Sequence, residues 1–137
     1  ESTRKKCRFL EKIAGHLGQG GISVTWARAE VAGYDPRFRE QFDVATARGL
    51  GPLPTALECL APFVRPGGHL IAMKGVQAES EWNCSATACE KLGIDLVSIV
   101  HPLPLTCPQS ALVIMQKPGV LSPEFPRRTG IPTKRPL

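Results

Sequence analysis

The middle of the chain constrains the fold most, because two short apolar runs enclose a helical pattern. The first run covers residues 42–47 and ends at Arg48, and the second covers residues 69–73 and ends at Lys74. Residues 54–64 between them have the spacing of an amphipathic helix, which a Pro-Gly-Gly turn follows. This succession is typical of a βαβ unit with parallel strands. Both strands would carry a cation at their carboxyl end, the edge where open α/β sheets bind ligands.

Further elements are predicted on both sides of this unit. The patterns indicate a helix over residues 3–17, a short strand over 22–26, a helix over 79–92, and strands over 96–100 and 111–116. The last two strands are joined closely enough to favour an antiparallel pair, while Pro102, Pro104 and Pro108 exclude regular pairing in their connection. Trp26 and Trp82 are expected to pack in the core.

The composition restricts the class of protein. The 137 residues suffice for at most one ordinary domain, and the net charge of +5 favours an anionic partner, most commonly nucleic acid. Residues 4–12 include five cations on one helix face, which either remains solvated or contacts a polyanion. No apolar run approaches the roughly 20 residues that span a bilayer, so we expect a soluble, cytoplasmic protein. Five cysteines without a CxxC pair indicate free thiols and no metal site.

The tail, residues 118–137, is rich in Pro and Gly and ends with basic residues. Its composition offers too little apolar surface for the segment to order itself alone. We therefore divide the chain into a domain over residues 1–117 and a basic, Pro-rich tail. The tail cations are the best candidates for phosphate contacts, although a solvated tail remains an alternative.

A glycine-rich phosphate loop is absent from the sequence. The glycines at 18–21 follow a helix and those at 67–68 precede a strand, so neither group has the strand-turn-helix context of a GxG fingerprint. Glu1 stands where the second strand of a nucleotide-binding sheet would end, and a carboxylate there accepts hydrogen bonds from ribose hydroxyls. We interpret the chain as lacking the first strand, first helix and second strand of such a sheet.

An ordered set of short motifs carries a family resemblance over essentially the whole chain. The motifs are Glu1-Ser-Thr-Arg-Lys-Lys with Phe9-Leu10, Arg28-Ala29-Glu30, Phe42-Asp43-Val44 with Ala47-Arg48, Arg65-Pro66-Gly67-Gly68, and Met73-Lys74-Gly75. With this spacing the chain resembles the C-terminal portion of the small-subunit ribosomal RNA methyltransferase G family, also called the glucose-inhibited division protein B family. Its ending, from Pro126 to Leu137, resembles the cyanobacterial and plastid branch.

The resemblance implies a fold and an activity. The fold would be α/β, a Rossmann-like class I S-adenosylmethionine-dependent methyltransferase that is N-terminally truncated and lacks the first strand and glycine-rich loop. The activity would be methylation of N7 of a guanine in 16S small-subunit ribosomal RNA, in the cytoplasm or, in a photosynthetic eukaryote, the plastid stroma. We expect a monomer whose partner is that RNA.

The same resemblance assigns cofactor residues, and the charge pattern suggests RNA contacts. Glu1, Ser2 and Thr3 would face the ribose of S-adenosylmethionine, Ala29 and Glu30 would lie beside its adenine, and Arg48 would lie near its methionine end. The predicted RNA-binding residues are Lys74, Arg127, Arg128, Lys134 and Arg135. No catalytic residue is assigned, because guanine N7 is already a nucleophile and the reaction mainly requires alignment.

Two other functions remain open at this level. The first is a catalytically incompetent fragment that retains only the RNA-binding surface. The second is a different Rossmann-like enzyme, such as a nucleotide-dependent oxidoreductase. The oxidoreductase is disfavoured because its defining glycine loop is not observable in this sequence and the tail matches nothing in such enzymes.

The missing central strand yields a prediction about stability. Without it, residues 22–26 have no hydrogen-bonding neighbour and residues 42–47 form an exposed edge. Each unpaired buried amide costs roughly 1–3 kcal/mol, so the chain alone should be marginally stable, with residues 51–116 the best-ordered part. Amide hydrogen exchange measures this directly. Slow exchange throughout residues 22–26 in a monomer would contradict the prediction.

Overall fold

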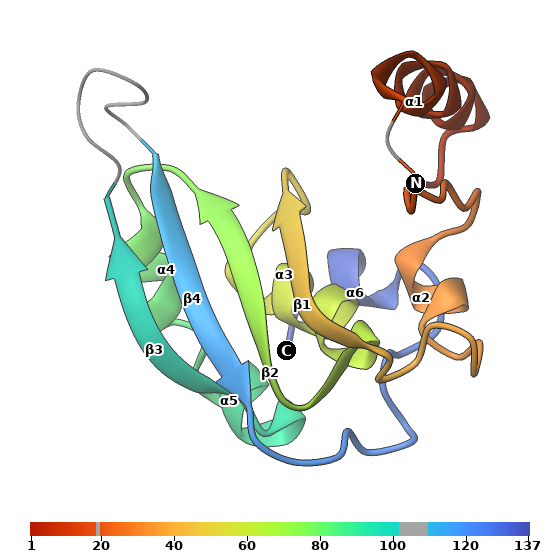
Figure 1. Cartoon of the computed structure of the whole chain (residues 1–137). Helices are drawn as coiled ribbons and strands as arrows, with labels where there is room; N and C mark the ends of the chain where they lie inside the picture. Colours follow the sequence, from red (N-terminus) through yellow and green to blue (C-terminus); the bar gives the residue numbers. More distant parts are fainter. Residues whose placement is uncertain (19, 102–109) are drawn as a thin grey trace.

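The computed structural model describes residues 1–18, 20–101 and 110–137, and four strands in them form one mixed sheet. The strands are β1 (Phe42–Arg48), β2 (Val64–Lys74), β3 (Asp95–Val100) and β4 (Ala111–Lys117), in the spatial order β1-β2-β4-β3 (Figure 1). β1 and β2 are parallel, whereas β4 is antiparallel to both β2 and β3. The predicted βαβ unit and the antiparallel last pair are therefore confirmed, and the α/β class with them.

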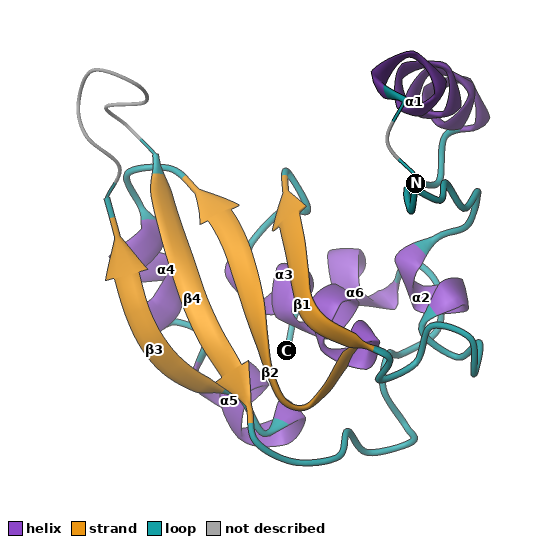
Figure 2. Cartoon of the chain, viewed as in Figure 1, coloured by secondary structure: helices purple, strands orange, loops and turns teal. Residues whose placement is uncertain are grey.

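Short helices cover one face of this sheet (Figure 2). They are α3 (Leu53–Leu60), which continues as a 3-10 turn over Ala61–Phe63, α4 (Ala78–Asn83), α5 (Ala86–Leu92) and α6 (Ile131–Lys134). Alternate residues of β4 point toward these helices, so Val113 and Met115 are fully buried against Leu53 and Leu57 in one core. α1 (Arg4–Leu17) and α2 (Ala29–Ala32) lie beyond the β1 edge.

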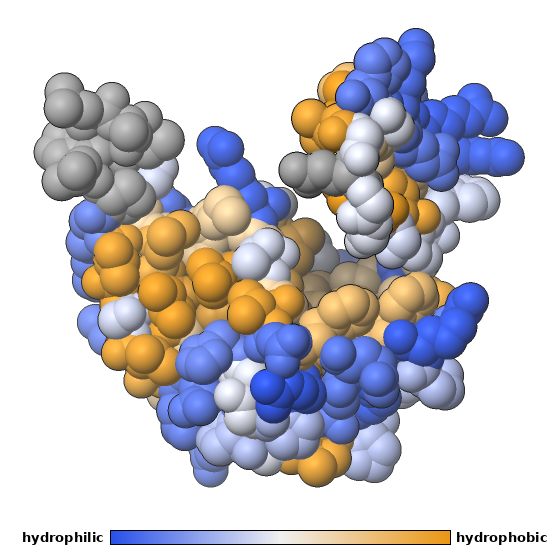
Figure 3. All heavy atoms as spheres, in the orientation of Figure 1, coloured by the Kyte–Doolittle hydropathy of each residue, from blue (hydrophilic) through white to orange (hydrophobic). Residues whose placement is uncertain are grey.

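The opposite face of the sheet is apolar and exposed in the described part of the chain. Met73 pairs with Leu112, which also pairs with Val100, so these side chains share the face turned away from the helices. Met73 and Val100 are exposed, and Figure 3 shows hydrophobic side chains gathered over this side of the sheet. Of the helices described, none is long and apolar enough to cross a membrane.

The Pro-Gly-Gly turn lies inside β2 rather than before it. Phe42 pairs with Val64 and Val44 pairs with His69, so the extra residues of β2 are absorbed as an irregularity beside β1. A Cβ atom on Gly68 would lie 2.6 Å from the Asp43 carbonyl oxygen, so only glycine permits this close approach.

Two predicted helices have different limits in the structure. Residues 79–92 form two helices because the Ser85 hydroxyl donates to the Glu81 carbonyl (2.6 Å), while the Ser85 amide donates to the Trp82 carbonyl (2.8 Å). These two hydrogen bonds tighten the last turn of α4, and α5 begins as a separate helix after it. The helix predicted over residues 54–64 ends at Leu60 and becomes a 3-10 turn at Pro62, which has no amide hydrogen to continue it.

The predicted strand over residues 22–26 is not formed. The Glu1 nitrogen donates to the Thr25 carbonyl (3.1 Å), and the Ala27 amide donates to the Glu1 carbonyl (3.1 Å), which is the bond pattern of one parallel ladder pair. Ser2 and Thr3 then lead into α1, so the pairing ends there and the segment is extended without a ladder. The predicted connection through Pro102, Pro104 and Pro108, together with Cys107, lies outside the described residues.

Residues 118–137 pack against the domain, which supplies the apolar surface that this segment lacks alone. Leu121 and Phe125 are buried in the main core, and the Thr55 hydroxyl donates to the Pro132 carbonyl (2.8 Å). The Arg127 guanidinium lies 2.6 Å from the fully buried Glu58 carboxylate, which also accepts the Arg127 amide (2.8 Å). The tail is therefore docked across α3 and is not the solvated segment that the sequence left open as an alternative.

A second buried ion pair holds the start of this segment. Lys117 is completely buried at the end of β4, and its ammonium contacts the Glu40 carboxylate, which also accepts the Leu121 amide (2.8 Å). Burial alone would raise the pKa of Glu40, but the hydrogen bonds from Lys117 and Leu121 hold that pKa below its ordinary value. The carboxylate therefore remains ionised at neutral pH, as the buried lysine requires.

The docked tail should depend on the charge of Glu58. We expect Glu58→Gln to lower the free energy of unfolding by about 1–3 kcal/mol, because one partner of a mostly buried pair is removed. The control Asp43→Asn breaks an exposed pair with Arg65 and should cost less than about 1 kcal/mol. Urea denaturation measures both, and equal effects would contradict the anchoring role.

Candidate functional site

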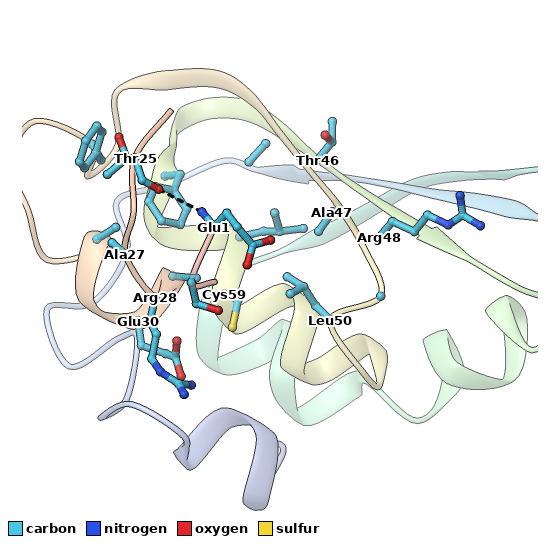
Figure 4. A pocket seen from close by; sticks show the side chains of 18 of the residues that line it. Glu1, Thr25, Ala27, Arg28, Glu30, Thr46, Ala47, Arg48, Leu50 and Cys59 are labelled. Atoms are coloured by element: carbon cyan, nitrogen blue, oxygen red, sulfur yellow. Dashed lines mark hydrogen bonds between the residues drawn. The ribbon is translucent and has the colours of Figure 1, made fainter. Parts of the chain in front are cut away.

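A hollow of about 740 Å³ lies beside the carboxyl end of β1. It is lined by all six residues that the resemblance assigns to the cofactor: Glu1, Ser2, Thr3, Ala29, Glu30 and Arg48. They come from three separate parts of the sequence, which the fold brings to one edge of the sheet (Figure 4). The volume is in the range of sites that hold a small molecule or cofactor.

Glu1 supplies an ionised carboxylate to this hollow. One of its oxygens, Oε1, accepts the Thr3 amide (2.7 Å), and this backbone hydrogen bond lowers the pKa of the carboxyl group. The other oxygen has no hydrogen-bond partner among the described residues, and the side chain extends into the hollow (Figure 4). A ligand with neighbouring hydroxyl groups fits this free acceptor.

Glu30 is held more tightly than the sequence suggests. It lies in the first turn of α2, is only 8% exposed, and accepts the Gly130 amide (2.8 Å) through Oε1. The docked tail therefore orients this carboxylate at the wall of the hollow. Ala29, its neighbour, begins the same helix and also lines the hollow.

Arg48 lies on the rim at the end of β1, level with Met73 of β2. Figure 4 shows its side chain directed along the sheet edge, away from Glu1. Its guanidinium has no acidic partner within 4 Å in the part of the chain described. It is thus available to an anionic group at the mouth of the hollow.

Several lining residues were not predicted from the sequence. They include Lys6, Thr25, Arg28, Thr46, Cys59 and Thr133. The alternation of residues 22–28 could have indicated Thr25, because residues two apart share one side of an extended segment. No local signal could have indicated Thr133, since only the docking of the tail brings it to the hollow.

The predicted RNA contacts fall into two groups. The Lys74 ammonium lies 2.6 Å from Glu81 and donates to the Gly51 carbonyl (2.7 Å), and its side chain is 11% exposed. Arg127, with a side chain 27% exposed, is held by Glu58. Both cations thus have partners within the fold, which the sequence did not reveal. Arg128, Lys134 and Arg135 are exposed, and Lys134 follows the hollow-lining Thr133.

The residues present fit the nucleoside portion of S-adenosylmethionine. The free oxygen of Glu1 suits a ribose diol, and Ala47, Leu50 and Leu60 add apolar surface for a flat base. The glycine-rich turn that would complete a dinucleotide-type site is absent from the sequence. The fit therefore concerns one side of such a cofactor.

Comparison with known proteins identifies relatives of this chain. The family model for rRNA small subunit methyltransferase G matches residues 1–104. Proteins named ribosomal RNA small subunit methyltransferase G from Moorella thermoacetica and from Caldanaerobacter subterraneus subsp. tengcongensis are 44% and 40% identical over 139 and 138 residues. These alignments include 100% of this chain but only 58% and 57% of those proteins, so the chain spans less than three fifths of their length.

One solved structure is similar in part. It is the T. thermophilus 16S rRNA N2 methyltransferase RsmC in complex with AdoMet and guanosine, with a TM-score of 0.41 and 16% identity. The similarity covers 62% of this chain and 22% of that chain.

Cys59 provides a chemical test of the closed wall of the hollow. Burial, with smaller contributions from the charges of Glu30 and Glu58, raises the pKa of the Cys59 thiol to about 12. At pH 8 only about one thiol in ten thousand would be ionised, so iodoacetamide should react far more slowly with Cys59 than with exposed Cys84. Peptide mass spectrometry over time measures both rates. Equal rates would show that the wall opens readily.

Proposed function

The chain belongs to the rRNA small subunit methyltransferase G family, and on this premise we propose that the protein methylates N7 of a guanine in 16S small-subunit ribosomal RNA, with S-adenosylmethionine as the methyl donor. The observation that supports this proposal most is the convergence of six residues, from three parts of the sequence, on one hollow. All six lie within the residues that the family model matches.

In this proposal the chain binds the nucleoside side of the donor. The free carboxylate oxygen of Glu1 accepts hydrogen bonds from the ribose, and Ala29 and Glu30 lie beside the adenine. Arg48, on the rim, neutralises the carboxylate of the methionine portion or contacts the target base. When bound, the donor supplies a methyl group on a positively charged sulfur.

The side chains of this site have a positioning role in the proposed reaction. Guanine N7 has a lone pair in the plane of the ring, so no general base is needed to generate the nucleophile. Glu1 and Glu30 are fixed by hydrogen bonds to Thr3 and Gly130, which limits their motion before a ligand binds. Rate enhancement then comes mainly from holding the two reactants in line.

RNA is the proposed partner on the outer surface. Arg128, Lys134 and Arg135 are exposed on the docked tail, close to the hollow, and suit phosphate contacts. Because Glu58 holds the tail in place, the backbone that carries these cations loses little conformational freedom on binding. The proposed activity belongs in the compartment that contains such ribosomes, the cytoplasm or a plastid stroma.

A second function is favoured by the exposed cations Arg128, Lys134 and Arg135 beside the hollow. With these cations alone the chain would bind RNA without holding the donor. Calorimetric titration of this chain with S-adenosylmethionine distinguishes the two functions. Micromolar affinity would support the methyltransferase, whereas RNA binding that weakens with salt and no donor binding would support the alternative.

The carboxylate of Glu1 should contribute measurably to donor binding. We expect Glu1→Ala to weaken S-adenosylhomocysteine binding by about tenfold or more, because a charged acceptor facing the ribose is lost. The matched control Glu90→Ala removes an exposed carboxylate on α5 and should leave the affinity unchanged. Calorimetry measures both variants, and an unaltered affinity for Glu1→Ala would remove this residue from the site.

A further inference from the structure

Trp26 is exposed, although its sequence context predicts a core residue. Its side chain has a relative exposure of 59%, and its Nε1 donates to the Ser2 carbonyl (2.9 Å). The Arg4 guanidinium lies 5.1 Å from the centre of the indole ring. The ring is therefore fixed on the surface, with its polar atom already bound within the protein. Rigid, exposed aromatic rings of this kind are the surfaces on which unstacked bases bind.

A row of cations continues from Trp26 along α1. Arg4, Arg8 and Lys12 are four residues apart, so they lie on one side of the helix, and all three are exposed. Like charges at this spacing destabilise a helix, and within the described chain no carboxylate lies within 4 Å of any of them. Figure 3 shows the hydrophilic outer side of α1 at the upper right. A polyanion would relieve this repulsion.

Five other cations of the domain differ in this respect. Arg37, Arg65, Lys74, Lys117 and Arg127 each lie within 4 Å of a carboxylate. Much of the excess positive charge is therefore carried by α1 rather than by the sheet and its helices. This distribution favours an interaction surface over general solubility.

This surface adjoins the candidate site. Thr25 and Ala27, on either side of Trp26, line the hollow, and so does Ser2, whose carbonyl binds the indole. Because side chains alternate along an extended segment, Trp26 points away from the hollow that its neighbours line. A base stacked on Trp26 would thus lie beside the hollow proposed for the donor and outside it.

We propose that Trp26 and the row Arg4, Arg8 and Lys12 bind a single-stranded RNA segment flanking the target guanine, with one base stacked on the indole and its phosphates along α1. This inference rests on the proposed function, which supplies RNA as the substrate. Single-stranded RNA is the ligand class because bases within a duplex are not free to stack on a side chain.

The test uses a fluorescein-labelled oligoadenylate of about 12 nucleotides and fluorescence anisotropy on the full chain. We expect Trp26→Ala to weaken binding by about tenfold, whereas Trp26→Phe, which keeps an aromatic ring, stays within about threefold. Combined replacement of Arg4, Arg8 and Lys12 by glutamine should reduce the salt dependence by about two charges. The control Lys91→Gln, an exposed cation on α5, should change neither quantity.

A second readout reports on the indole itself. The chain has two tryptophans, so in Trp82→Phe the fluorescence comes from Trp26 alone and should be quenched by the oligoadenylate. Unchanged affinity in Trp26→Ala, or duplex RNA binding as tightly as the single strand, would overturn the proposal. S-adenosylhomocysteine binding is measured separately on the unmodified chain, and its absence there would count against the proposed function alone.

Discussion

The buried carboxylate of Glu58 is the constraint on which the rest of this structure depends. It lies in α3, whose eight residues are all buried, so an unpaired charge there would be strongly destabilising. The Arg127 guanidinium and amide compensate it from a segment 69 residues away along the chain. If the tail left the domain, the Glu58 carboxylate would therefore remain as an unpaired charge in an apolar environment. Through this contact a Pro-rich segment becomes part of the core.

The same docking shapes the candidate site. Gly130, three residues beyond Arg127, donates to Glu30, and Thr133 contributes to the wall of the hollow. The tail also displays Arg128, Lys134 and Arg135 on its outer side. The carboxylate proposed to lie beside the adenine is thus oriented by the same anchored segment that carries the cations proposed to contact RNA. Displacement of that segment would alter both together.

The charges of this chain have two distinct roles. Those that the structure pairs, such as Lys117 with Glu40 and Lys74 with Glu81, hold elements of the fold in register. Those on α1 and the outer tail have no such partner among the described residues and face solvent. The net charge of +5 therefore includes charges of two kinds: ion pairs that hold the fold, and cations that form a surface suited to a polyanion.

The sequence alone determined the local elements and the ends of the parallel strands. The apolar runs that end at Arg48 and Lys74 could be recognised because strand periodicity is a short-range property. The motif residues Glu1, Glu30 and Arg48 were found to line one hollow. Their nearness followed from the family resemblance, because of the three only Arg48 lies at the end of a strand in this structure. Other features were decided only by tertiary contacts. The partner of Glu58, the exposure of Trp26 and the absence of a ladder at residues 22–26 depend on groups distant in the chain. The burial of a side chain and its hydrogen-bond partners depend on residues that the fold brings together, and no local pattern of side chains specifies them.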